Sequence, residues 1–399
     1  MMTPTTSIRK IIHIDADCFF AAIEMRDDSR LRHVPMAVGS AEVRRGVIAT
    51  CNYEARKFGI HSAMASSQAL RQCPQLIIVP GRMSAYRKAS AQMREIFSEY
   101  TDLIEPLSLD EAYLDVTVSD RCKGSATLIA TEICQRIEET LNITVSAGVA
   151  ANKFLAKVAS DWNKPNGLTV ILPSEVAEFV RVLPVERIHG VGKVMAAKMQ
   201  RLGIKTCEDL QPLSIFKLNE MFGSFGVRLH ALCKGCDDRA VVSSRRRKSL
   251  SVEHTYRADL YGVQACVDKL PELLRLLNER LAPLTGYDGA TGRDKTTEHD
   301  ETTDNDDANV SRSKELGQAD FSVSRSHCYR IHKIFVKIKF SDFTSTTIER
   351  IGAYNCLDEY CDLLYEALQR CDSPVRLLGL GVRFVNLGSN SDFFQFSLF

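Results

Sequence analysis

Three carboxylates in this sequence stand next to expected strands and could together bind metal ions. Asp15 follows the apolar run Ile11–Ile14. Asp110 and Glu111 are adjacent and precede the extended run Ala112–Val116. Neighbouring side chains on a strand point to opposite faces, so the adjacent pair can serve one site only at a bend between two strands. Because carboxylates beside apolar strands need a compensating cation or hydrogen bonds, the pattern predicts two Mg²⁺ ions, an arrangement suited to in-line attack on a phosphate.

The segment around the first acid is expected to run from a buried strand into a helix. Ile11–Ile14 is rich in β-branched residues. Asp17 has the chemistry of an N-cap for a helix over Cys18–Met25, whose free N–H groups would form a phosphate cradle. Phe19 and Phe20 would ordinarily be core residues, but beside a nucleotide site one of them would stand against the sugar.

A second group of residues could hold an anion. Two short strands are predicted over Val34–Gly39 and Gly46–Cys51. Tyr53 and Arg56 share one face of a helix and could hold the same anion, although alone the pair is better explained as an arginine stem on an aromatic ring. Lys164, before a Pro–Gly turn, lies either over a triphosphate or in water.

The order of elements around the carboxylates favours an α+β fold. Helices are predicted over Ser84–Tyr100, Ala126–Leu141 and Ala151–Ser160, and a strand over Thr144–Val149. With the acidic hairpin between the first two helices, the order strand-helix-strand-strand-helix-strand is typical of a ferredoxin-like palm.

A glycine turn further along is expected to contact DNA. Gly190 and Gly192 precede Lys193 and the predicted helix Val194–Leu202. Such a turn presents backbone N–H groups that bind a phosphate without reading sequence, and the pattern favours a helix-hairpin-helix. A basic run at a predicted domain boundary is either a solvated linker or a phosphate contact; it comprises Arg245, Arg246, Arg247 and Lys248.

The last part of the chain is expected to form a sheet with one face for DNA. Three segments alternate between apolar and polar residues: Leu250–Tyr256, Ile334–Phe340 and Leu378–Val385. Lys337 and Lys339 would lie on the outer face as a backbone-binding platform. Helices over Val263–Leu281 and Asn355–Cys371 would cover the inner face.

The composition is that of a multidomain protein without secretion or membrane signals. The chain has 399 residues, thirteen cysteines and no apolar run of membrane-spanning length, so we expect reduced thiols, a cytoplasmic location and no membrane. Its net charge is +1, but Thr285–Ser326 holds ten acidic and five basic residues, which leaves +6 elsewhere. That segment is expected to be a disordered acidic insertion.

The chain ends in an apolar tail behind a polar lead. We expect this tail to dock into a partner's pocket as a short linear motif, with folding back onto its own core as the alternative. Gln395 would hydrogen-bond the pocket rim, and Leu398 and Phe399 would be the apolar anchors beside Phe396.

These motifs, in this order, resemble those of the Y-family DNA polymerases, closest to the bacterial DNA polymerase IV branch. The matching segments are Ile14–Phe20, Asn52–Gly59, Leu107–Asp115, Ala147–Gly167 and Ile188–Leu202, with a clamp-binding tail at Phe394–Phe399. The resemblance implies a palm within 1–173, which contains small fingers at about 27–74. A helix-hairpin-helix thumb over 174–242 and a basic linker over 243–249 would follow. The last parts would be an α/β little finger over 250–388, which contains the insertion 285–326, and the tail 389–399.

The resemblance also implies roles for single residues. Asp15, Asp110 and Glu111, with the main-chain carbonyl of Ala16, would bind two Mg²⁺ ions. Phe20, beside Phe19, falls on the position that rejects ribonucleotides. The triphosphate positions are Thr50, Tyr53, Arg56 and Lys164. The implied partners are primer-template DNA, a deoxynucleoside triphosphate (dNTP) and, through the tail, the replication sliding clamp. The enzyme itself is expected to be a monomer.

The resulting hypothesis is low-fidelity, template-directed DNA synthesis past lesions, without a proofreading exonuclease. A template-independent or single-nucleotide transferase on the same scaffold would give different product lengths. A non-catalytic DNA- or clamp-binding scaffold would gain nothing from three carboxylates beside DNA. A nuclease would use two metals but needs no triphosphate grip.

Overall fold

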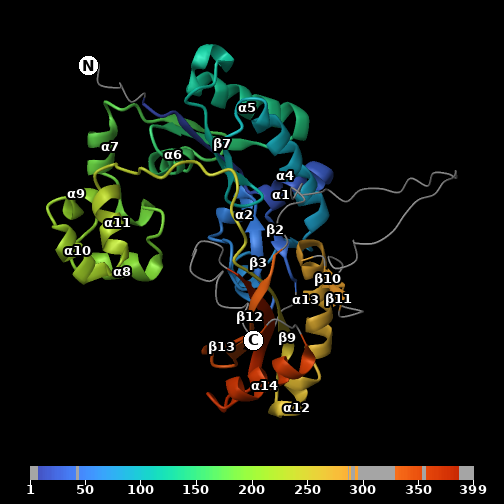
Figure 1. The fold of residues 1–399 in the computed structure, drawn as a ribbon. Helices are drawn as coiled ribbons and strands as arrows, with labels where there is room; N and C mark the ends of the chain where they lie inside the picture. The colour runs from blue at the N-terminus through green and yellow to red at the C-terminus, as the bar shows by residue number, and fades with distance from the viewer. Residues whose placement is uncertain are drawn as a thin grey trace, which may run out of the picture. The chain divides into compact units, whose positions relative to one another are not determined.

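The computed structural model describes residues 8–41, 45–285, 287–288, 293–294, 329–352 and 356–385. The chain divides into two compact units, 1–245 and 246–399, which are treated separately here (Figure 1). The tail 389–399 and most of the predicted insertion 285–326 lie outside the described residues. No helix among the described residues is long and apolar enough to cross a membrane.

The first unit is built on a five-stranded sheet in the order β5-β6-β1-β7-β8. Its strands are β1 (Ile11–Ala16), β5 (Ile104–Pro106), β6 (Glu111–Asp115), β7 (Val145–Ala150) and β8 (Leu168–Val170). All neighbours are antiparallel except β7 and β8. The helices α1 (Phe19–Asp27), α4 (Met83–Ser98) and α5 (Ala126–Leu141) stand in the predicted order, so the ferredoxin-like expectation is confirmed.

The two faces of this sheet differ because side chains alternate along β1. Ile12, Ile14 and Ala16 join the apolar core that contains residues of α4 and α5. The alternate residues of β1 therefore point to the opposite face, where α6 (Lys153–Ser160) packs against β1 and β7. Asp15 stands on this second face, directly opposite Glu111 of β6.

The expected N-cap role of Asp17 is wrong. Helix α1 begins at Phe19, and its N-cap is Cys18 in a left-handed conformation, without a side-chain cap. The buried Asp17 carboxylate instead accepts hydrogen bonds from Thr144 Oγ1 at 2.8 Å and Ser146 Oγ at 2.9 Å. These two donors, at and just before the start of β7, hydrogen-bond the carboxylate in place of the amides of the helix start.

The remaining parts of the first unit contain the two predicted short strands and the predicted helix after the glycine turn. A three-stranded sheet in the order β3-β2-β4 contains both strands expected there; its elements are β2 (Met36–Gly39), β3 (Ile48–Cys51), β4 (Ile77–Val79), α2 (Tyr53–Arg56) and α3 (Ser66–Gln72). A helical part comes next, with α7 (Val176–Arg181), α8 (Lys193–Arg201), α9 (Cys207–Leu210), α10 (Ile215–Phe222) and α11 (Phe225–Leu232). The predicted glycine turn directly precedes α8.

The second unit is a four-stranded antiparallel sheet with helices packed against it. The strand order is β13-β12-β14-β9, with β9 (Ser249–Leu260), β12 (Ile331–Phe340), β13 (Ser345–Ile351) and β14 (Val375–Phe384). The helix expected over 263–281 is two helices, α12 (Gly262–Val267) and α13 (Leu270–Thr285), and the later one is α14 (Leu357–Leu368). Their apolar residues share one core with the sheet.

Part of the segment expected to be disordered forms backbone pairs. β10 (Tyr287–Asp288) pairs with β11 (Arg293–Asp294) in an antiparallel register. This pairing differs from the expectation because strand hydrogen bonds link backbone groups and need no apolar side chains.

Candidate active site

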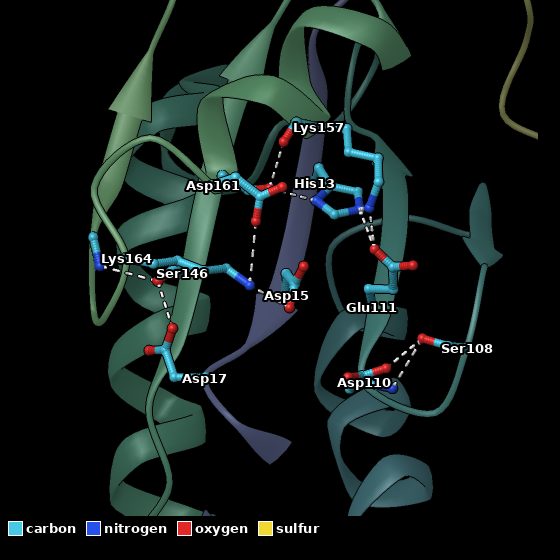
Figure 2. Close-up of polar contacts among 12 residues, drawn as sticks. His13, Asp15, Asp17, Ser108, Asp110, Glu111, Ser146, Lys157, Asp161 and Lys164 are labelled. Atoms are coloured by element: carbon cyan, nitrogen blue, oxygen red, sulfur yellow. Dashed lines mark hydrogen bonds and ion pairs between the residues drawn. The ribbon is translucent and has the colours of Figure 1, made fainter. Parts of the chain in front are cut away.

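The candidate site lies where β1 and β6 meet beside α6 (Figure 2). Asp15 and Glu111 face each other across the two strands. With His13 they form a group in which one ligand atom from each residue lies within 4.8 Å of the others. The structure therefore brings together two of the three predicted acids and adds a histidine.

Glu111 is held by two nitrogen donors. His13 Nε2 lies 3.1 Å from Oε2 of Glu111, and Lys157 Nζ also contacts that oxygen. Burial alone would raise the pKa of Glu111, but the hydrogen bonds from His13 and Lys157 outweigh it and lower the pKa to about 2. Glu111 is therefore a carboxylate at neutral pH.

Asp15 is less well compensated. Burial raises its pKa to about 6, even though Lys164 Nζ lies 2.6 Å from its Oδ1. Lys164 also lies 3.4 Å from Asp161, so its charge is shared between two carboxylates. A carboxylate in this state is one that a bound cation would stabilise.

Asp110 lies at the predicted bend, between the end of β5 and the start of β6. Its carboxylate accepts a hydrogen bond from Ser108 Oγ and does not belong to the group of three metal-ligating side chains found among the described residues. Its main-chain oxygen accepts from Ala16 N at 3.0 Å, which fixes the bend against the end of β1. The metal-binding role of Asp110 stays a prediction, as does that of the Ala16 carbonyl.

The two adjacent phenylalanines occupy different environments. Phe19 is buried in the core, whereas Phe20 is partly exposed and its ring stacks on Tyr86, with centroids 4.3 Å apart. Of the two, Phe20 is thus the ring that a ligand could reach.

The predicted triphosphate residues are arranged around Asp17 and Asp15. The Arg56 guanidinium lies 4.5 Å from the centre of the Tyr53 ring, and the Tyr53 hydroxyl lies 3.4 Å from Asp17 Oδ1. Thr50 is on β3, half-buried. Lys164 is bound to Asp15, so in this state its charge is paired with that carboxylate.

The predicted DNA contacts of the first unit differ in their availability. Gly190 adopts φ 106°, and an added Cβ would come within 2.9 Å of the Phe225 ring, so this turn needs glycine. Gly192 is the N-cap of α8, and Lys193 is exposed. Arg245, in contrast, binds the buried Glu105 at 2.8 Å.

In the second unit the predicted contacts have partners of their own. Arg246 lies over the Tyr329 ring at 5.3 Å, and the Arg247 backbone N–H donates to the Tyr329 hydroxyl. Lys337 pairs with Glu253 at 2.7 Å, and Lys339 lies 4.9 Å from the centre of the Phe343 ring.

Sequence reasoning missed three residues of the site: His13, Lys157 and Ser160. His13 Nδ1 lies 2.7 Å from Ser160 Oγ, and Lys157 stands one turn before Ser160 on α6. The signal for His13 was present, since it stands two residues before Asp15 on a strand and therefore on the same face. No comparable signal marks the two residues of α6, because their proximity depends on how the helix packs.

Comparison with known proteins covers nearly the whole chain. The impB/mucB/samB family matches residues 14–161, its C-terminal domain matches 247–398, and the thumb domain of DNA polymerase-iota matches 186–237. DNA polymerase IV of Pseudomonas putida (strain GB-1) is 53% identical over 381 residues, 96% of each chain. DNA polymerase IV of Ectopseudomonas mendocina (strain ymp) is 52% identical over 391 residues, 98% of this chain and 99% of the relative.

Solved structures agree with these relatives. A Y-family DNA polymerase chimera, Dbh-Dpo4(243-245)-Dbh, superposes with a TM-score of 0.76 at 28% identity, covering 94% of this chain and 98% of the other. An insertion ternary complex of Dbh DNA polymerase gives 0.61 at 27% identity, covering 94% and 99%. The chain therefore belongs to the DNA polymerase IV branch of the Y-family DNA polymerases.

Proposed function

We propose that this chain is a template-directed DNA polymerase for translesion synthesis and that Asp15, Asp110 and Glu111 hold two Mg²⁺ ions in its palm. The observation that carries the proposal is the placement of Asp15 and Glu111 opposite each other at the ends of two strands. Both side chains are partly exposed, and each is bound to a lysine ammonium. These ammonium groups mark positions where positive charge is stabilised.

The donor set fits a hard divalent cation. Carboxylate oxygens are the ligands that Mg²⁺ prefers, and the raised pKa of Asp15 indicates a charge that the protein alone compensates incompletely. Asp110 would complete the set by turning its carboxylate from Ser108 toward Asp15, and the Ala16 carbonyl stands at the same bend. When bound, the two ions would activate the primer 3′ oxygen and stabilise the leaving pyrophosphate.

The chain's own residues bind and orient the nucleotide. Lys164 would transfer from Asp15 to the triphosphate, which Thr50 and the stacked pair of Tyr53 and Arg56 would also bind. Phe20, fixed by its stack on Tyr86, would pack against C2′ of the sugar and leave no room for a hydroxyl. Phe20→Ala should therefore admit ribonucleotides, whereas Phe19→Ala should mainly lower stability.

The proposed DNA-binding and partner-binding residues lie in other parts of the chain. Gly190, Gly192 and Lys193 would bind a backbone phosphate, and the outer face of β12 with Lys337 and Lys339 would bind another. The tail would dock on the replication sliding clamp through Gln395, Phe396, Leu398 and Phe399. The enzyme itself would be monomeric and cytoplasmic.

A primer-extension assay with Mg²⁺ and the four dNTPs, on normal and adducted templates, tests the proposal. Asp15→Asn, Asp110→Asn and Glu111→Gln should each abolish extension while primer-template binding persists, because duplex affinity comes from phosphate contacts elsewhere. Normal extension by the variants would contradict the metal assignment. Products whose length and sequence ignore the template would indicate a single-nucleotide transferase, and binding without any extension by the parent would indicate a scaffold.

A further inference from the structure

We propose that His13 is a positioning residue, which holds the Glu111 carboxylate in place for metal binding through the hydrogen-bond chain Ser160–His13–Glu111. The inference rests on the proposed metal-binding role of Glu111. His13 is fully buried, and both of its ring nitrogens have partners. Ser160 Oγ lies 2.7 Å from Nδ1. Glu111 Oε2 lies 3.1 Å from Nε2 (Figure 2).

A glycine makes this chain of contacts possible. Gly148 stands beside His13 on β7, and a Cβ at Gly148 would lie 2.0 Å from Ala156 O and 2.3 Å from Ser160 N. Only a residue without a side chain therefore lets α6 come this close to the sheet. This close approach places the Ser160 hydroxyl beside Nδ1 of His13.

The acceptor on Glu111 fixes the tautomer of the ring. A carboxylate can only accept, so Nε2 must carry the proton that is donated to Oε2. In the neutral ring Nδ1 is then an acceptor for the Ser160 hydroxyl at 2.7 Å, and Lys157 O, 2.9 Å from the same hydroxyl, is the alternative acceptor. The Tyr113 ring, 4.7 Å from that of His13, packs beside it. Glu111 is thus held by a donor whose position and tautomer are both determined.

The second donor to Glu111 cannot have this role once a cation is bound. The Lys157 ammonium also contacts Oε2 and is charged, so a metal ion at Glu111 would repel it. The His13 ring donates to Glu111 from Nε2 while its Nδ1 accepts from Ser160, which is the hydrogen-bonding pattern of a neutral imidazole. His13 can therefore keep its hydrogen bond with the ion in place, as partners of metal-ligating carboxylates do.

Two amide substitutions separate positioning from packing. In the full-length His13→Gln variant the terminal amide reaches the position of Nε2 and can still donate to Glu111. In His13→Asn the shorter amide reaches only the position of Nδ1, beside Ser160. Both place a polar amide in the same buried site, and Tyr113→Phe serves as a control that leaves the ring contact intact.

The readout is Mn²⁺ binding to the protein alone, followed by electron paramagnetic resonance, together with the Mg²⁺ dependence of extension. We expect His13→Asn to bind Mn²⁺ on the order of 10–100-fold more weakly than the parent, with His13→Gln and Tyr113→Phe within a few-fold. The primer-template Kd should not change. Equal Mn²⁺ affinity in His13→Asn and His13→Gln would overturn the proposal.

Ser160→Ala and Glu111→Gln complete the test. Ser160→Ala should weaken Mn²⁺ binding a few-fold, because Nδ1 loses its donor. An unchanged Mn²⁺ affinity would overturn the proposed hydrogen-bond chain Ser160–His13–Glu111, even if His13→Asn does not fold. Retained extension and Mn²⁺ binding in Glu111→Gln would contradict the proposed function itself. Loss in Glu111→Gln without loss in His13→Asn would contradict only the role of His13.

Discussion

Two glutamates of one hairpin, Glu105 on β5 and Glu111 on β6, each bind a lysine of helix α6, yet their environments differ. Lys153 and Lys157 are one helical turn apart, so they present their ammonium groups on one face. The Glu105 and Lys153 side chains are 1% and 2% exposed, whereas those of Glu111 and Lys157 are 21% and 15% exposed.

The number of further donors separates the two pairs. Glu105 also accepts from Val242 N at 2.9 Å and from Arg245 at 2.8 Å, and Lys153 also donates to Ala240 O. Every partner of this pair is a protein group, and the Glu105 and Lys153 side chains are themselves shielded from water. Glu111 keeps access to solvent, so under the proposed function its lysine would be exchanged for a metal ion. Burial would then separate a structural ion pair from a functional one with the same chemistry.

The largest expected effect is on activity, from Glu111→Gln. Extension should fall on the order of 10³-fold or more, because the substitution removes a metal-binding charge. The thermal midpoint should change little, as the amide fits the same partly exposed position. Single-turnover extension and a thermal melt measure the two quantities. In a matched Glu105→Gln variant the thermal midpoint should fall while extension is largely kept. Loss of extension in Glu105→Gln at an unchanged thermal midpoint would contradict the contrast between the two ion pairs.

The next effect is on stability, from Lys153→Met. Removing Lys153 from the buried ion pair leaves Glu105 with the largely exposed Arg245 as its remaining cationic partner, so the free energy of unfolding should fall by about 3–5 kcal/mol. The double substitution Glu105→Leu with Lys153→Met should recover part of this loss, because no buried charge is left. Urea unfolding of the single and double variants checks it. If the double variant is as unstable as the sum of both single variants, the pair is not coupled.

A smaller effect is expected from Lys157→Met. The pair is partly exposed, so the free energy of unfolding should change by less than about 1 kcal/mol. Without the competing ammonium, Mn²⁺ should bind several-fold more tightly to the protein alone. Mn²⁺ titrations of Lys157→Met, the parent and Lys153→Met measure this difference. Weaker Mn²⁺ binding in Lys157→Met would mean that this lysine helps to build the site.

The smallest effect is expected from Arg245→Gln. Its side chain is 69% exposed although it binds Glu105, so stability should change by at most about 1 kcal/mol. If Arg245 serves as an anchor and not as a DNA contact, the salt dependence of primer-template binding should stay the same. Lys193→Gln is the matched substitution, for which the salt slope should fall. A weaker salt dependence of primer-template binding in Arg245→Gln would indicate that Arg245 does contact a DNA phosphate.

Sequence patterns predicted the elements and the facing acids because period and burial are local properties. Strand periodicity in β1 and the bend before Glu111 placed two of the acids correctly. The role of Asp17 was misjudged because an acid before a helix is a local cap signal, whereas its actual donors, Thr144 and Ser146, are distant in sequence. His13 was overlooked because its partners depend on the packing of α6 against Gly148.

The junction between the two units has a consequence for how DNA would be retained. The Arg245 side chain is fixed to Glu105 in the first unit, and Arg247 N is fixed to Tyr329 in the second, so Arg246 alone separates the anchored residues. Two Cα steps of about 3.8 Å limit this tether to roughly 7 Å. If both units hold the duplex as proposed, this tether would give one unit an effective concentration on the order of millimolar for a duplex held by the other. A grip that is briefly lost by one unit would therefore re-form faster than the duplex escapes.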